Sequence, residues 1–220
     1  MNKRIICGVF AILASMVAVA QSGTESPYSQ YGLGVISDPS QGFTRGMNGV
    51  GLALRRGTVV NTLNPASYSA IDSLTMVFDM GVSGQITNFK EGGSSVNKKN
   101  ANFEYAVGSF RLLPTVGMAF GVLPFTNIGY TYSSSTYLNQ ANGTISETYS
   151  GSGGLHQVFL GAGWQVLRPL SVGANVAYLW GNYNKSVISS STSYVNSLQK
   201  SYTASVSSYR LELGTETCFL

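Results

Sequence analysis

The feature that most constrains this chain is the alternation of apolar and polar residues over positions 74–86. Within this stretch one parity is mostly apolar and the other is mostly small or polar, which is the period of two that a β-strand imposes. The stretch is longer than the five or six residues of an ordinary strand and reaches the ~9 to 11 that a tilted strand needs to cross a bilayer. It therefore predicts a membrane-spanning strand in preference to a strand of a soluble sandwich.

The N-terminus has the pattern of a secretory signal. Lys3 and Arg4 precede an apolar run over residues 5–20, which ends in Ala18-Val19-Ala20. The run is shorter than the ~20 apolar residues of a transmembrane helix and ends on the small residues that a signal peptidase accepts. We therefore expect a signal peptide over residues 1–20, cleaved between Ala20 and Gln21, rather than an uncleaved anchor.

The composition of the remaining chain fits a membrane wall. Charged residues make up 10% of the sequence, against ~25% in soluble domains, whereas Gly (26) and Tyr (13) are abundant. Without Lys3 and Arg4, 11 basic residues face 9 acidic ones, which is too balanced for a nucleic-acid partner. Cys218 is then the single cysteine, so no internal disulfide and no cysteine-based metal site is expected.

Further stretches of alternating residues follow the first one. Tight turns are predicted at 113–114 and 167–169, whereas polar stretches over 133–152 and 181–200 are predicted to be long loops. Outer-membrane barrels alternate long extracellular loops with short periplasmic turns in this way, and Tyr178 and Trp180 then fall near the outer rim, where an aromatic girdle is expected. The predicted strands are 74–86, 101–112, 115–132, 153–166, 170–180 and 202–214.

The strand at 115–132 contains a proline. Apolar residues keep the same parity before and after Pro124, which indicates one long kinked strand with one apolar face. Since proline cannot donate to a β-ladder, the wall is predicted to be locally unzipped at Pro124 and Phe125.

The domain organisation follows from these stretches. Residues 21–72 lack sustained alternation and form a compact segment, residues 73–214 form the strands, and residues 215–220 are irregular. Six strands do not close a barrel, because eight is the smallest single-chain size. We therefore expect this chain to be part of a longer protein.

Chemical sites are few. His156 is the single histidine, and its parity places it on the lipid-facing side near the rim, so no catalytic site, metal or cofactor is expected. Asp79, Glu104 and Arg111 fall on inward or rim positions, where they line a lumen or form structural ion pairs with the plug.

Asn64-Pro65-Ala66 is the most informative short motif, because it stands just before the first predicted strand. Other notable segments are residues 26–34, the small-residue segment with Gly46, Gly49 and Gly51, residues 121–125, and residues 153–157. In these segments, over residues 26–214, the chain resembles the FadL-type outer-membrane transporters of long-chain fatty acids and other hydrophobic compounds, in the form common among Bacteroidetes. Asn64-Pro65-Ala66 matches that family's Asn-Pro-Ala hatch motif.

The resemblance implies an all-β fold, a transmembrane antiparallel β-barrel of fourteen strands of which about six are present. It implies that residues 21–72 are a hatch that plugs the barrel from the periplasmic side, with Asn64, Pro65 and Ala66 facing a lateral opening at Pro124 and Phe125. The implied function is passive uptake of hydrophobic small molecules such as long-chain fatty acids, in which movement of the hatch gates lateral exit through the kinked third strand.

These expectations set the partners and the location. The location is the bacterial outer membrane, and the partners are its lipids, a hydrophobic small-molecule ligand and the barrel assembly machinery. A structural or adhesive barrel, whose long extracellular loops bind a surface partner, is the alternative. Loop deletions that abolish such binding without a change in permeability would favour it.

Overall fold

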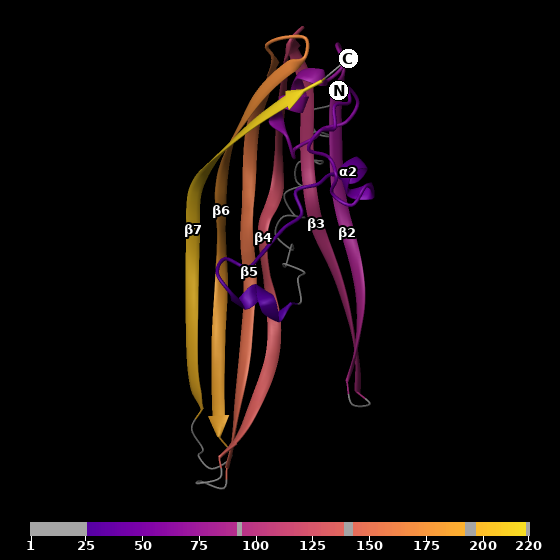
Figure 1. The fold of residues 1–220 in the computed structure, drawn as a ribbon. Helices are drawn as coiled ribbons and strands as arrows, with labels where there is room; N and C mark the ends of the chain where they lie inside the picture. The colour runs from indigo at the N-terminus through magenta and orange to yellow at the C-terminus, as the bar shows by residue number, and fades with distance from the viewer. Residues whose placement is uncertain (1–25, 92–93, 139–142, 192–196, 219–220) are drawn as a thin grey trace, which may run out of the picture.

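Six long strands form one antiparallel sheet in the computed structural model, which describes residues 26–91, 94–138, 143–191 and 197–218. Strand order follows the chain from β2 to β7, so each long strand pairs with its sequence neighbour (Figure 1). The long strands are β2 (Met76–Glu91), β3 (Ser94–Leu113), β4 (Val116–Leu138), β5 (Gly143–Gln165), β6 (Leu170–Ser191) and β7 (Leu198–Thr217).

The sheet carries a smaller layer on one of its faces. This layer, residues 26–72, we call the hatch, the sheet face that it covers the hatch face, and the opposite side the outer face. Its elements are η1 (Pro27–Gln30), β1 (Val35–Ile36), α2 (Gly42–Gly46) and η2 (Pro65–Ala70). In the described residues the sheet is open, with β2 and β7 at its edges.

Burial follows the predicted alternation. On β5, Leu160 is 56% exposed on the outer face and its neighbour Phe159 is 5% exposed on the hatch face. On β6, Val176 is exposed in the same way and Ala177 is buried. The outward parity predicted for these two strands is therefore confirmed. Exposed apolar side chains on the outer face include Met76, Phe78, Met80, Val158, Trp164, Leu211 and Leu213.

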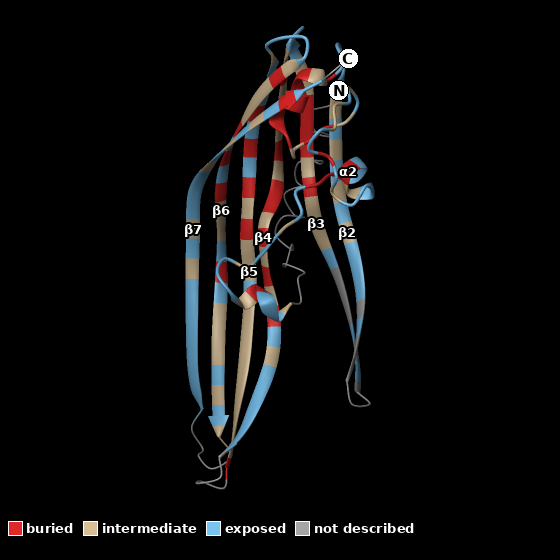
Figure 2. Cartoon of the chain, viewed as in Figure 1, coloured by how far each residue is buried: buried red, intermediate tan, exposed pale blue. Residues whose placement is uncertain are grey.

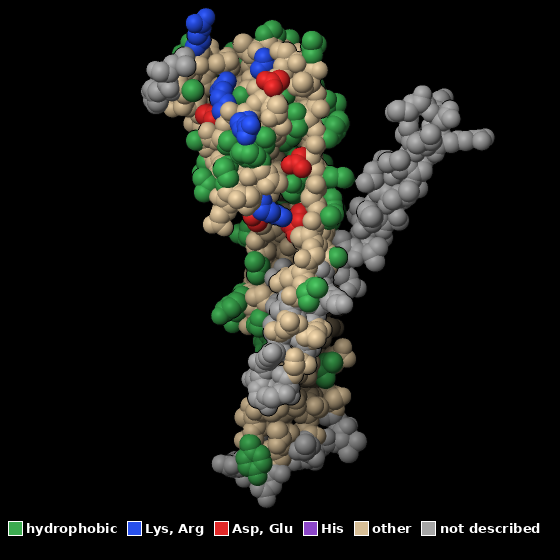
Figure 3. Space-filling model, turned by 90° about the vertical axis from the view of Figure 1, so that its right-hand side faces the viewer, with side chains coloured by type: hydrophobic (Ala, Val, Ile, Leu, Met, Phe, Trp, Pro, Cys, Tyr) green, Lys and Arg blue, Asp and Glu red, His purple; other side chains and the backbone are tan. Residues whose placement is uncertain are grey.

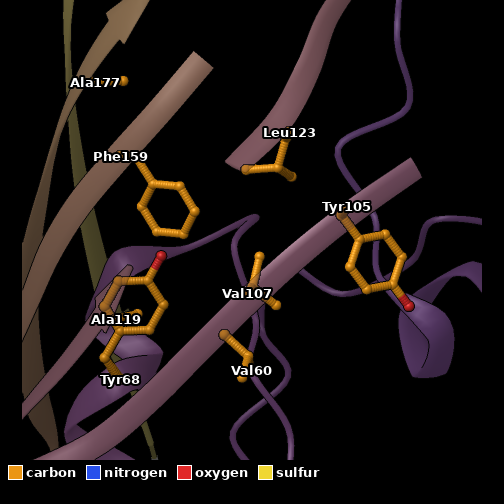
Figure 4. Packing of buried hydrophobic residues seen from close by; sticks show 8 residues of the cluster. All are labelled: Val60, Tyr68, Tyr105, Val107, Ala119, Leu123, Phe159 and Ala177. Atoms are coloured by element: carbon orange, nitrogen blue, oxygen red, sulfur yellow. The ribbon is translucent and has the colours of Figure 1, made fainter. Parts of the chain in front are cut away.

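The core lies between the hatch and the sheet. Figure 4 shows Val60 and Tyr68 of the hatch packed against side chains from four strands, and Figure 2 shows that buried residues gather where the hatch covers β3 to β6. The sheet partners in this cluster are Tyr105, Val107, Ala119, Leu123, Phe159 and Ala177. Burial of these side chains is what joins the hatch to the wall.

The described residues of the two polar stretches predicted as long loops are mostly strand. β4 continues to Leu138 and β5 begins at Gly143, within the predicted 133–152 loop, and β6 continues to Ser191. Backbone pairing between neighbouring antiparallel strands extends the ladders without an apolar side-chain pattern. The prediction of an irregular end from residue 215 is likewise wrong, since β7 runs through Thr217. The predicted signal peptide lies outside the described residues.

Candidate functional site

The motif Asn64-Pro65-Ala66 starts the short helix η2. The Oδ1 atom of Asn64 accepts a hydrogen bond from the backbone N of Ala66 at 3.1 Å, so Asn64 is the N-cap. Pro65 holds the first helical position, where its missing N–H costs nothing. The Asn64 amide also donates to the carbonyl oxygens of Leu52 (2.9 Å) and Thr215 (3.2 Å). The motif therefore joins the hatch to β7.

A floor of glycines receives η2 on the hatch face. A Cβ added at Gly117 would lie 1.8 Å from the carbonyl oxygen of Tyr68, and one at Gly173 would lie 2.3 Å from the carbonyl carbon of Pro65. Real Cβ contacts essentially never fall below 3.0 Å, so only glycine admits the helix this close. The floor consists of Gly117 on β4, Gly163 on β5, Gly173 on β6 and Gly214 on β7.

The expectation that this motif faces the kink is wrong. Pro124 is level with His156 of β5, whereas the floor glycine of β5 is Gly163. Seven residues of strand separate the two levels, about 23 Å at ~3.3 Å per residue. The motif lies at the glycine floor because the backbone of η2 can approach the sheet only where the strands carry glycine.

The kink at Pro124 is a β-bulge. Pairing with β5 passes from Pro124–His156 to Thr126–Leu155, so Phe125 is the extra residue. The β4–β5 ladder continues on both sides of the bulge, so the wall stays paired on the β5 side of β4. On the β3 side, the β3–β4 ladder of the described residues ends at Val122, two residues before Pro124. The predicted unzipping at Pro124 and Phe125 is therefore confirmed on the β3 side, with a one-residue bulge on the β5 side.

The bulge also reverses the faces of β4, which the sequence interpretation did not anticipate. Before it, Ala119 and Leu123 are buried on the hatch face. After it, Ile128 is fully buried and Tyr130 is 8% exposed, and the hydroxyl of Tyr132 donates to Gln30 of the hatch. The prediction of one continuous apolar face is therefore wrong, because one inserted residue exchanges inward and outward parity.

The wall does open on the other side of β4. β3 and β4 pair from Leu113–Val116 to Ala106–Val122, and the register of described residues contains no β3–β4 pair beyond that point. In Figure 1 the β2–β3 hairpin separates from the other four strands, β4, β5, β6 and β7. This separation we call the lateral gap.

A segment of the hatch lies along the β4 side of the lateral gap. Residues 26–37, which we call the strap, contain β1, and Val35 pairs with Asn127 of β4. The backbone N of Ser26 donates to the carbonyl oxygen of Gly129, and the N of Ser37 donates to that of Phe125, both at 3.0 Å. The strap therefore takes the place beside β4 that β3 leaves.

A pocket of about 350 Å³ lies at the same level. It joins the two sides of the lateral gap, with Phe103 and Glu104 from β3 and Pro124 from β4. His156 also lines it, with its ring 6.1 Å from that of Trp180. The sequence placed His156 near the end of its strand, but β5 runs from Gly143 to Gln165 and His156 lies near its middle. It lies beside Trp180, whose ring stacks on that of Tyr178 at 6.1 Å.

Two of the three charges predicted to face inward contact the hatch. The guanidinium of Arg45 lies 3.1 Å from the Glu104 carboxylate, and Arg111 donates to the carbonyl oxygen of Ser69 at 3.4 Å. Asp79 accepts a hydrogen bond from the Tyr105 hydroxyl of the neighbouring strand β3 at 3.3 Å. Glu104 therefore forms an ion pair with the hatch, the structural role that the sequence left open beside a lumen role. Figure 3 shows charged side chains gathered on the upper part of one side of the molecule, while its lower part is mostly neutral and polar.

The small-residue segment forms a turn inside the hatch. α2 ends at Gly46, Gly49 has a φ of +78°, and Gly51 packs beside Thr44 and Leu63. The segment therefore packs against other residues of the hatch.

Other contacts were not predicted. Lys185 donates to the carbonyl oxygens of Gln30 (2.7 Å) and Gly32 (3.0 Å), and Ser29 of the strap is fully buried. Arg55 donates to Ser171 at 2.6 Å. Glycines at hatch-face positions of four strands were the available signal for the glycine floor under η2, but no local pattern pairs them with a helix about 50 to 150 residues away.

Comparison with known proteins gives one match. No curated protein and no solved structure matches the chain. A family model described as BamG matches residues 1–218, nearly the whole sequence. In the described residues no helix has the length and apolar character needed to cross a membrane. The chain forms an all-β sheet with an exposed apolar face, and the family model matches nearly its whole length. It therefore belongs to the BamG family.

Proposed function

We propose that this protein is an outer-membrane β-barrel component that works with the barrel assembly machinery, with the hatch as a fixed part of its wall. The family match over residues 1–218 carries the proposal, since the name BamG points to outer-membrane biogenesis. The glycine floor supports a structural role of the hatch, because the close packing of η2 against four glycines holds this helix in one position.

Association is tested on protein purified from the outer membrane in mild detergent. An affinity tag on the full-length protein is expected to recover the central barrel of the assembly machinery in stoichiometric amount. Depletion of the protein is expected to lower the amounts of unrelated outer-membrane barrels. Recovery of none of the machinery, with unchanged barrel levels after depletion, would contradict the proposal.

Passage of hydrophobic small molecules, such as long-chain fatty acids, is the second candidate. The lateral gap and its pocket favour it, because a ligand in the pocket lies beside a break in the β3–β4 ladder. In this mechanism apolar groups capture the ligand near the extracellular mouth, and the ligand leaves past Pro124 and Phe125. The resemblance to FadL-type transporters supports the same mechanism.

Uptake of a fluorescent long-chain fatty acid by cells producing the protein tests this second function. Asn102→Trp places a bulky ring at the pocket lining, and uptake is expected to fall several-fold. Ala101→Trp, on the neighbouring exposed position, is the matched control and is expected to retain uptake. Equal uptake by cells with and without the protein would exclude the passage function.

A further inference from the structure

The edge of β4 in the lateral gap is a strand-binding surface. β3 leaves β4 after Val122, and over the next residues the strap supplies the backbone partners instead. The carbonyl oxygens of Phe125 and Gly129 accept hydrogen bonds from the strap. An edge that binds an extended segment through its backbone has the chemistry of β-strand addition.

The strap is weakly held in comparison with η2. In η1 only Ser29 is buried, and both residues of β1 are exposed. Tyr28 is 80% exposed and Ile36 is 72% exposed, whereas five of the six residues of η2 are buried. A segment held by backbone pairing and few apolar contacts belongs to the low-stability end of a fold.

The contacts that hold the strap are polar and specific. Ser29 Oγ accepts a hydrogen bond from the backbone N of Gly129 (3.2 Å), and Lys185 reaches two strap carbonyl oxygens. The Asn127 amide donates to Ser37 Oγ at 2.9 Å. Any extended segment with free carbonyl groups could use Lys185 and the β4 edge in the same way.

We propose that the β4 edge in the lateral gap binds an extended β-strand of another polypeptide, and that the strap is the intramolecular segment that occupies this edge until such a strand displaces it. The bound strand alternates apolar and polar residues, because one of its faces joins the apolar outer face of the wall. The inference rests on the proposed role in barrel assembly, where unpaired strands are the substrate.

The test uses a fluorescent peptide with the sequence of residues 26–37 and the full-length protein in detergent. The intact strap competes at an effective concentration near millimolar, so wild type is expected to bind the peptide weakly. Ser29→Ala with Val35→Pro removes the Ser29 hydroxyl contacts with Gly129 and the β1 backbone donor of the strap, which weakens the strap but leaves the edge intact. This variant is expected to bind the peptide at least about tenfold more tightly, a change of ~1.4 kcal/mol.

Two controls make the result specific. Adding Lys185→Met to the released variant is expected to weaken peptide binding, and a peptide carrying proline at the position of Val35 is expected not to bind. Equal binding by wild type and the released variant, or equal binding of the proline peptide, would overturn the proposal.

A locked variant covers the case in which the released variant does not fold. Val35→Cys with Asn127→Cys joins two directly paired positions, in a Cys218→Ser background. The oxidised form is expected not to bind peptide and the reduced form to bind as wild type does; binding by the oxidised form would refute the edge assignment. If peptide binds as expected but depletion leaves barrel assembly unchanged, the edge assignment stands and the proposed function fails.

Discussion

At the scale of single residues, the glycine floor makes a strong prediction. Gly163→Val would place its Cβ 2.5 Å from the carbonyl oxygen of Pro65 and 2.9 Å from the backbone N of Ser69. Both neighbours are backbone atoms, so the hatch must shift, at a cost of about 1–3 kcal/mol. Protease resistance of the hatch is expected to fall. Ala162→Val, on the exposed outer face of the same strand, is the control and is expected to behave as wild type.

The cap of η2 gives a second prediction at this scale. Asn64→Ala removes the acceptor for the Ala66 N–H and two donated hydrogen bonds. A loss of about 1–2 kcal/mol is expected from the cap, measured as a lower denaturant midpoint. Asn64→Ser keeps a capping oxygen but not the donors, so its denaturant midpoint is expected to lie between those of Asn64→Ala and wild type. Serine as damaging as alanine would show that the donors, not the cap, matter.

Asp38 gives a prediction on pH. Burial raises the pKa of its carboxyl group, but hydrogen bonds from the Ser40 side chain and backbone, together with the Arg45 charge, outweigh burial and hold the pKa below 3.8. A lowered folded-state pKa stabilises the fold above the unfolded pKa, and this contribution is lost as pH falls through the folded value. Hydrogen exchange near residues 38–45 should therefore rise below about pH 4. In Asp38→Asn this rise should be smaller.

At the scale of elements, the bulge decides which side chains face the hatch. Deletion of Phe125 would remove the extra residue and turn Ile128 and Tyr130 away from the hatch. We expect the deletion protein to lose heat-modifiable migration as a folded barrel. Phe125→Ala keeps the bulge and loses only the ring that lies 5.2 Å from the Arg210 guanidinium, so it is expected to fold. Normal folding of the deletion protein would contradict this account of the bulge.

At the scale of the whole molecule, the outer face carries an apolar belt between Trp164 at one end and His156 with Trp180 at the other. Trp164 and His156 lie eight residues apart on β5, and His156 pairs with Trp180. Eight residues span about 26 Å along the strand, or roughly 20 Å across a bilayer at the ~40° tilt of barrel strands, which is most of the ~25 Å apolar band of an outer-membrane barrel. Strand residues beyond His156, to Gly143, extend the wall outside this belt.

Brominated lipids test the belt. Trp164 and Trp180 are expected to be quenched more by bromine near the lipid headgroup than near the chain end, each measured with the other tryptophan replaced by phenylalanine. Leu160→Trp, midway and 56% exposed, is expected to show the reverse order in a background without the two native tryptophans. No difference among the three positions would show that the belt does not match a bilayer.

The sequence by itself determined that six strands follow residues 21–72, that β5 and β6 have an apolar outer face, and that the wall opens beside Pro124. These features are local, because alternation, turn residues and prolines are readable within a few positions. The tertiary structure decided how far the strands extend, the position of Asn64 at the glycine floor, the reversed faces after Pro124 and the location of the opening between β3 and β4. Each depends on how backbones far apart in sequence approach or separate, and no local periodicity carries that information.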